Sequence, residues 1–208
     1  MALLPHSFYT RPDVVQIARE LLGRQIFTRM DGITTSGIIC ETEAYAGTTD
    51  KASHAYGGRR TRRTEIMYAC GGTAYVYLCY GIHSLFNVVT NVEDVPHAVL
   101  IRGIIPADGI KTMVQRAGKI KETRDLGMGP GKVSKILGIH FSHSGLDLVN
   151  MPENKDTPSI WIADSAYTLN PGAIKSGARI GVGYAGEDAL LPYRFFVGDI
   201  EELFRNPL

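Results

Sequence analysis

Two carboxylates and a phenol stand at alternate positions in residues 41–45, which read Glu-Thr-Glu-Ala-Tyr. Side chains alternate between the two faces of a strand, so Glu41, Glu43 and Tyr45 are predicted to share one face. A carboxylate walled by aromatic rings is partly desolvated, which raises its pKa and its basicity. Glu43 is therefore the best candidate for a group that positions and deprotonates a water. Glu41 is either a second acid or a structural partner of an arginine.

Aromatic and basic residues follow these acids. Tyr45, His54 and Tyr77 are candidates for a stacking pocket, because aromatic faces bind flat heterocycles and attract cationic ones more strongly. Residues 51–63 hold five basic side chains and no acidic one. A polyanion such as nucleic acid is the partner that this cluster favours. Taken singly, each feature also fits a plain alternative, since strand tyrosines commonly pack in sheets and arginine runs are commonly solvated.

A β-hairpin is predicted where a strand from Thr73 to Cys79 reaches Tyr80-Gly81 and turns back. Its aromatic tip has two interpretations. Tyr80 either wedges into the minor groove, filling the gap left in a base stack, or packs against its own hairpin.

A buried arginine is predicted in the next apolar run. Residues 98–105 read AVLIRGII, and a buried strand does not carry a charge such as that of Arg102 without a partner. That partner is either an acid of the core or, in the functional interpretation that we favour, Glu43 or a substrate phosphate.

The elements that must position these residues follow from periodicity. The alternation places Ile38, Cys40, Thr42 and Ala44 on one face of the central strand and Ile39 on the face of the acids. A core helix is predicted after Thr10, which would cap it. Further elements are a helix over residues 108–115, a helix that begins in the GPGK segment of residues 129–132, and strands over residues 25–29, 146–149, 159–163 and 194–197. The GPGK segment fits either a phosphate held by free backbone N–H groups or a glycine-capped core helix.

Composition limits the class of protein. The chain has 208 residues, 44% hydrophobic and 21% charged, with a formal net charge of +1. This is typical of a soluble globular domain in which any attraction to a polyanion must come from local clustering. Three cysteines without a C-x-x-C pair argue against a disulfide framework and against a zinc or iron–sulfur site. Without a signal peptide or an apolar run that could span a bilayer, the expected location is cytoplasmic and nucleoid-associated, or nuclear in a eukaryote.

Six fragments in order resemble the alkyladenine, or 3-methyladenine, DNA glycosylase family. They are ETEAY (41–45), ASH (52–54), GGRRTRRTEIM (57–67), AYVYLCYGIHSLFNVV (74–89), GPGK (129–132) and RIGVGYAGE (179–187). The resemblance runs from about residue 11 to residue 197. Any one fragment is weak, but six in one order are highly specific.

The resemblance implies a single domain over residues 1–208 with an α+β fold. Helices would surround an antiparallel or mixed sheet, and a DNA-inserting hairpin would protrude from it. The implied protein is a monomeric, monofunctional DNA glycosylase of base excision repair that needs no cofactor and no metal. It would act on double-stranded DNA, releasing alkylated or deaminated purines such as 3-methyladenine, 7-methylguanine, hypoxanthine and ethenoadenine, and would leave an abasic site.

The same resemblance implies a role for individual residues. Glu43 would activate the attacking water, and Arg102 and the backbone near Val182 would help to hold it. The other implied roles are base stacking by Tyr45, His54 and Tyr77, screening of purines by Asn87, intercalation by Tyr80, and contacts to the DNA backbone by Arg59, Arg63 and Met67. Leu85 and Tyr184 lie where family members vary around the pocket.

Two other functions also fit parts of the sequence. A non-catalytic nucleic-acid-binding module would use the arginines and Tyr80 but would leave Glu43 without a task. A helix-hairpin-helix protein would use the segments GMGPGKVSKIL (127–137) and GVGYAGEDAL (181–190) for phosphate binding.

Overall fold

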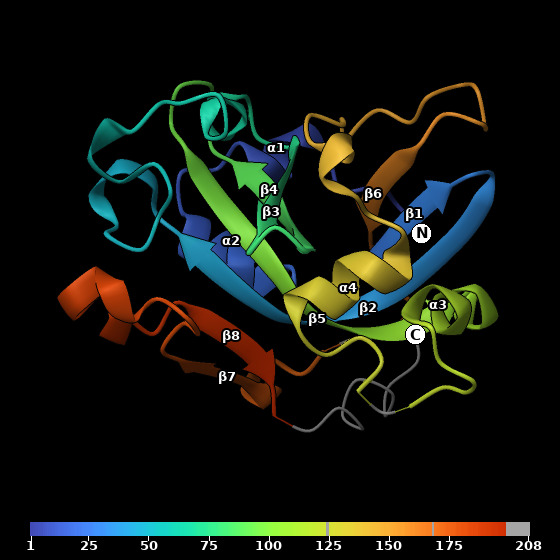
Figure 1. Cartoon of the computed structure of the whole chain (residues 1–208). Coiled ribbons are helices and arrows are strands. Elements are labelled where there is room, and N and C mark those ends of the chain that lie inside the picture. The colour runs from blue at the N-terminus through green and yellow to red at the C-terminus, as the bar shows by residue number, and fades with distance from the viewer. Residues whose placement is uncertain (124, 168, 199–208) are drawn as a thin grey trace.

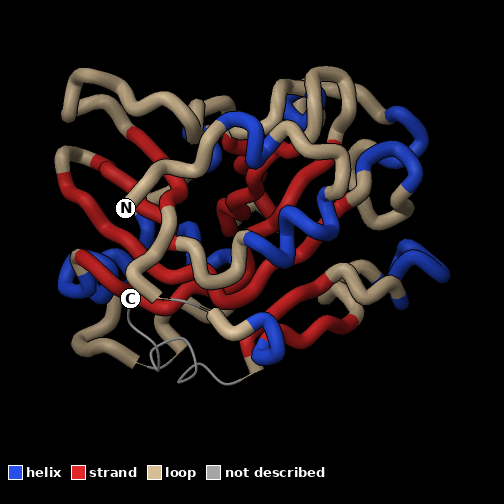
Figure 2. The backbone as a smooth tube through the Cα atoms, turned by 180° about the vertical axis from the view of Figure 1, so that it is seen from behind, coloured by secondary structure: helices blue, strands red, loops and turns tan. Residues whose placement is uncertain are grey.

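One antiparallel sheet dominates the structure, a computed structural model in which residues 1–123, 125–167 and 169–198 are described (Figure 1). Its strands are β1 (Gln25–Met30), β2 (Ile33–Tyr45), β3 (Ala74–Cys79), β4 (His83–Thr90), β5 (His97–Asp108), β6 (Ser159–Ala163), β7 (Ile174–Gly177) and β8 (Arg194–Val197). Six of them pair in the order β3-β4-β5-β2-β1-β6, while β8 pairs with β2 and with β7. Seen from behind, the sheet is curled, with helices and loops around it (Figure 2).

The helices are short. The α-helices are α1 (His6–Tyr9), α2 (Val14–Glu20), α3 (Ile110–Ala117) and α4 (Pro130–Leu137). The 3₁₀ helices are η1 (Gly47–Thr49), η2 (Tyr56–Gly58), η3 (Glu65–Tyr68), η4 (Phe141–His143), η5 (Pro171–Ala173) and η6 (Gly183–Leu190). The α+β fold that the family resemblance implies is thereby confirmed. In the described part of the chain, no helix is both long and apolar enough to cross a bilayer.

The main core lies where α2 and α4 cover one side of the sheet. Ile17 and Ala18 on α2 are fully buried against strand residues such as Ile101. Thr42 on β2 is buried there too and donates a hydrogen bond of 2.7 Å to the carbonyl of Ala18. These contacts fix β2 from its core side, so the opposite side of its final residues is free to build a site.

A double irregularity between β2 and β5 interrupts the alternation that the sequence predicts. Ile39 pairs with Ile104 and Thr42 with Ile101, but Glu41 between them pairs with Gly103, and the register shifts on both sides. Cys40 and Arg102 are thus left without a cross-strand partner in the β2–β5 ladder, as in a β-bulge. The predicted faces were wrong, because Ile39 and Ala44 lie in the main core and Thr42 is buried on the same side of the sheet. Beyond Ile39, the bulge exchanges the two faces of β2, so that side chains at even-numbered positions such as Thr42 and Ala44 point into the main core.

The hairpin of β3 and β4 ends in a tight turn. Cys79 pairs with His83, and the amide of Ile82 donates to the carbonyl of Cys79 at 3.1 Å. Tyr80 and Gly81 both have positive φ, 50° and 74°. Two successive positive φ values characterise the turns that fit the twist of a hairpin, so Tyr-Gly serves here as Asn-Gly does elsewhere.

Two predicted helix starts and one predicted strand were wrong, and one segment of the helix-hairpin-helix alternative has a different structure. Asp13, not Thr10, caps α2 by accepting from the amide of Gln16. Helix α3 begins at Ile110, because Asp108 ends β5 and its carboxylate accepts from Ser36. Residues 146–149 form only an isolated bridge at Asp147, whose carboxylate accepts from two following amides and makes a turn. Residues 183–190 form a 3₁₀ helix, which does not fit the second half of a helix-hairpin-helix motif.

Candidate active site

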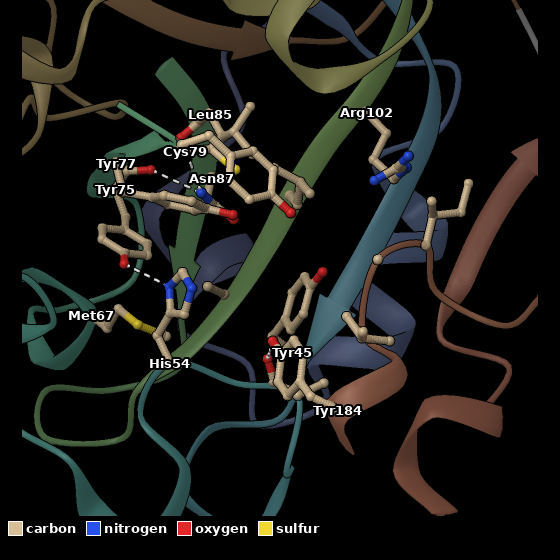
Figure 3. Close-up of a pocket in the computed structure, with 17 residues that line it drawn as sticks. Tyr45, His54, Met67, Tyr75, Tyr77, Cys79, Leu85, Asn87, Arg102 and Tyr184 are labelled. Carbon is tan, nitrogen blue, oxygen red and sulfur yellow. Dashed lines mark hydrogen bonds between the residues drawn. The ribbon is translucent and has the colours of Figure 1, made fainter. Parts of the chain in front are cut away.

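A cavity of about 210 Å³ opens on the side of β2 and β5 that faces away from α2. Four parts of the chain enclose it: the ends of β2 and β5, the hairpin of β3 and β4, the segment between β2 and β3 that carries His54, and the loop that leads into η6. Figure 3 shows the side chains of these elements pointing toward the cavity. Its lining includes the predicted pocket residues Tyr45, His54, Tyr77, Asn87, Arg102 and Val182, together with Tyr75, Leu85, Ile180 and Tyr184. Segments far apart in the sequence therefore converge here.

Glu43 lies directly behind this lining. Its side chain is 0% exposed, and three donors hold the carboxylate. The amide of Ile180 donates to Oε1 at 2.7 Å, and the hydroxyl of Tyr45 and Nη1 of Arg102 donate to Oε2 at 2.8 and 3.4 Å. All three donor residues also line the cavity, so one layer of polar groups separates the carboxylate from it.

Burial sets the protonation behaviour of this carboxylate. Desolvation raises the pKa of Glu43 above its ordinary value of 4.5, and the hydrogen bonds and the charge of Arg102 offset this rise only in part. A carboxylate with a raised pKa is a better base than an exposed one while it can still ionise at neutral pH. The prediction of a desolvated Glu43 is confirmed.

Arg102 bridges two carboxylates. Its Nε donates to Oε1 of Glu41 at 3.1 Å, and its Nη1 donates to Glu43. Arg194 lies 3.5 Å from the same oxygen of Glu41. The bulge places Arg102 in this position, because its side chain turns toward the acids where it has no cross-strand partner. Both predicted partnerships thus exist: Arg102 lies beside Glu43, and Glu41 pairs with arginines.

A second buried ion pair orders the loop that carries Ile180. Nη2 of Arg179 donates to Oδ1 of Asp50 at 2.8 Å, and its Nη1 donates to the carbonyl of Ala44 at 2.9 Å. The guanidinium also lies 4.9 Å from the centre of the Tyr45 ring. Sequence reasoning missed Arg179 and Asp50, which fix the loop against the end of β2 and so aim the Ile180 amide at Glu43.

One wall of the cavity is built from three aromatic rings: Tyr75 and Tyr77 on β3, and His54 from the segment between β2 and β3. Nδ1 of His54 and the hydroxyl of Tyr75 share a hydrogen bond of 2.9 Å, and the His54 ring meets the ring of Tyr77 edge-to-face at 4.7 Å. Figure 3 shows Tyr45 opposite these rings, with open space between. Burial, assisted by the charges of nearby arginines, lowers the pKa of His54 to about 4, so the imidazole is neutral at pH 7.

Asn87 closes the inner end of the cavity. Its side chain is buried, and Nδ2 donates to the carbonyls of Tyr75 and Leu85 at 3.1 and 3.3 Å. With both donors engaged by the backbone, the orientation of the amide group is fixed. Leu85, also buried, adds an apolar side chain to the same end.

The hairpin projects an aromatic ring into solvent. Tyr80 is 92% exposed, and its neighbour Ile82 is 73% exposed. Exposure of this degree excludes the alternative in which Tyr80 packs on its own hairpin. A large ring held out by a rigid turn is suited to contact another molecule.

The arginines of residues 59–63 divide into two groups. Arg60 forms ion pairs with Glu65 and Asp94 at 2.8 and 2.7 Å, so its charge is already compensated. Arg59, Arg62 and Arg63 form no ion pair with any residue that the structure describes. Arg63 lies 4.8 Å from the centre of the Tyr77 ring, at the rim of the cavity.

Two predicted residues lie deeper than their implied roles suggest. Met67 is 2% exposed and lines the cavity, so any contact that it makes with a DNA backbone would have to use its main chain. Val182 is buried against Ala52 and Ala185 and also lines the cavity, but the amide that reaches Glu43 belongs to Ile180. The described residues contain no cluster of three His, Cys, Asp or Glu side chains arranged to bind a metal.

Comparison with known proteins gives a consistent result. Residues 7–201 match the sequence model of the family described as methylpurine-DNA glycosylase. A protein of Chlamydia felis named "Putative 3-methyladenine DNA glycosylase" is 45% identical over 196 residues, covering 94% of this chain and 96% of the relative. Proteins of the same name from Clostridium perfringens and Bacillus thuringiensis are 39% and 42% identical, covering 94% and 92% of this chain and 96% and 94% of the relatives.

Proposed function

The chain belongs to the methylpurine-DNA glycosylase family and is a DNA glycosylase, and from this premise we propose that it hydrolyses the N-glycosidic bond of damaged purines extruded from duplex DNA. The proposed substrates are alkylated and deaminated purines of the 3-methyladenine, 7-methylguanine, hypoxanthine and ethenoadenine type. The observation that carries this proposal is the buried Glu43 carboxylate, held one layer behind a cavity with aromatic walls.

The purine base occupies the cavity, with Tyr45 on one side and Tyr77 and His54 on the other. Aromatic faces attract a cationic alkylpurine more strongly than a neutral base, by about 0.5–2 kcal/mol. A neutral His54 supports this arrangement, because a charged imidazole would repel such a base. The amide group of Asn87 is fixed at the inner end of the cavity. There it discriminates between purines by the substituents that they carry on the ring.

Glu43 acts as the general base. A water beside Arg102 and the Ile180 amide gives a proton to the carboxylate while its oxygen forms a bond to C1′. The bond from C1′ to the purine nitrogen breaks, and its electron pair leaves with the base. A cationic alkylpurine departs as a neutral molecule, whereas a neutral purine must also gain a proton. The positive charge that develops on the sugar is stabilised by the nearby carboxylate.

The DNA is held outside the cavity. Tyr80 enters the base stack where the damaged nucleotide has left, and Arg59 and Arg63 contact phosphates beside it. Extrusion costs about a few kcal/mol, and the cost is lowest for a poorly paired base. None of the described residues that line the cavity is a lysine, which supports a hydrolytic reaction that leaves an abasic site without cutting the strand.

Excision from defined duplexes tests this function. The protein is incubated with separate duplexes that carry hypoxanthine, 3-methyladenine or ethenoadenine, and the products are treated with alkali. We expect strand breaks at the damaged position after alkali and intact strands without it. If no lesion of this group yields an alkali-labile site, the proposed substrates are wrong.

A further inference from the structure

A second depression lies on the reverse side of the hairpin. It has a volume of about 660 Å³, and we call it the outer groove. Its apolar surface comes from Ile66, Val76, Leu78 and Phe141, and Arg62 lies at its edge. Val76 and Leu78 alternate along β3 with the tyrosines of the cavity, so they face away from it, and Tyr77 lies between the two depressions and lines both.

The exposed ring of Phe141 is held rigidly in place. Phe141 begins η4 and is 46% exposed, and its ring centre lies 4.1 Å from that of His140. His140 and His143 cap this turn reciprocally. The turn is tied to β3, because the hydroxyl of Ser144 accepts from the amide of Val76 at 3.1 Å and the amide of Gly145 donates to the carbonyl of Ala74 at 2.8 Å.

The charges around the outer groove favour an anion. Arg62 is exposed and forms no ion pair within the described residues. The acid of the groove, Glu65, binds Arg60 through both carboxylate oxygens, at 2.8 to 3.1 Å. Its charge is thereby compensated, which leaves Arg62 and Arg63 as the uncompensated charges at this edge.

The outer groove is continuous with the hairpin tip. Leu78 is 39% exposed and precedes Tyr80 by two residues, which span at most about 7 Å of chain. This is on the order of two steps along a DNA duplex, at about 3.4 Å each. When Tyr80 occupies the base stack, the nucleotides next to the extruded one must pass close to Leu78.

We propose that the outer groove binds the DNA strand beside the extruded nucleotide. This rests on the proposed function, since it assumes that Tyr80 inserts into DNA. The apolar surface of Leu78 and Phe141 contacts the deoxyribose, and the Arg62 guanidinium binds the adjoining phosphate. The outer groove thus supplies part of the affinity for the duplex, separate from the cavity that receives the base.

The test measures binding apart from chemistry. A duplex with a stable tetrahydrofuran analogue of an abasic site is titrated by fluorescence anisotropy over a range of salt concentrations. We expect Arg62→Gln to weaken binding about 5- to 10-fold and to reduce the slope of log K against log salt by about one, because one phosphate contact is lost. Phe141→Ala weakens binding by a similar factor without changing the slope.

Arg19 provides the matched control. It is an exposed arginine on α2, across the sheet from the hairpin, and it forms no ion pair with a described residue. Arg19→Gln is expected to bind like the wild type. A duplex in which a methylphosphonate neutralises the phosphate beside the lesion should weaken wild-type binding and leave Arg62→Gln unaffected.

Wild-type affinity and salt slope in both Arg62→Gln and Phe141→Ala would overturn the proposal. Arg62 and Phe141 are exposed, and equal unfolding temperatures of the variants confirm that only the surface has changed. Because the probe has no base to excise, failure of this proposal is separate from failure of the proposed function, which the wild-type excision assay measures.

Discussion

The Glu43 carboxylate accepts a hydrogen bond of 2.7 Å from the backbone amide of Ile180, 137 residues further along the chain. This bond joins the end of β2 to the loop before η6, and it orients the group that we propose as the general base. Arg179 beside it is locked to Asp50, so the amide is held by a buried ion pair and not by the loop alone. Catalytic geometry at Glu43 thus depends on residues that have no contact with the reacting atoms.

Glu41 is predicted to tune Glu43 through Arg102. The negative charge of Glu41 contributes to the raised pKa of Glu43, and Glu41 also competes for the guanidinium of Arg102. Glu41→Gln should therefore lower the pKa of Glu43 and move the acid limb of the excision rate to lower pH, with a rate at neutral pH reduced by less than about 10-fold. Single-turnover rates from pH 4 to 8 measure both effects. A uniform loss of rate with an unmoved limb would assign Glu41 a purely structural role.

His54 is predicted to remain uncharged down to about pH 4. In the unfolded chain it takes up a proton near its ordinary value of 6.5, so stability contributed by the buried neutral ring is lost as the pH falls from about 6.5 toward 4. NMR titration of the imidazole reports the pKa directly. Arg63→Gln should raise it, because the charge of Arg63 helps to depress it. Titration of His54 near pH 6.5 in the wild type would contradict the burial that the structure shows.

Tyr80→Ala is predicted to lower the rate of excision without changing the stability of the protein. The side chain is 92% exposed, so its removal should change the free energy of unfolding by less than about 0.5 kcal/mol. Excision at subsaturating enzyme should fall about 10- to 100-fold, because the gap in the base stack is left unfilled and the stacking energy of an aromatic ring is lost. Tyr80→Phe, which keeps the ring, is the control. Equal rates for Tyr80→Ala and the wild type would remove the intercalating role.

Much of the candidate site could be predicted from local sequence. Alternation alone placed Glu41, Glu43 and Tyr45 on one face, and the charge in an apolar strand indicated that Arg102 needs an acid. The bulge could not be predicted, because it depends on a match of registers between two strands about 60 residues apart, where Gly103 faces Glu41. A Cβ at Gly103 would lie 3.0 Å from that of Glu41, so the glycine allows the two strands to approach closely at the bulge.

Residues that act through the backbone or through charge pairs between distant positions left the weakest sequence signal. The Ile180 amide belongs to a residue whose side chain has no chemistry, and only the family resemblance, through the backbone near Val182, pointed to this segment. Arg60 looks the same in sequence as Arg59 and Arg62, yet it is paired with Glu65 and Asp94, 5 and 34 residues away. Pairings of this kind become visible only when the fold brings the acids into place.

The most direct test of the account is excision by Glu43→Gln under single-turnover conditions with saturating enzyme. The substitution keeps the shape of the side chain and the acceptor for the Ile180 amide, but it removes the base. We predict a rate at least about 100-fold below the wild type, with unchanged affinity for a duplex carrying an abasic-site analogue. Excision at the wild-type rate by this variant would contradict the central claim that Glu43 activates the water.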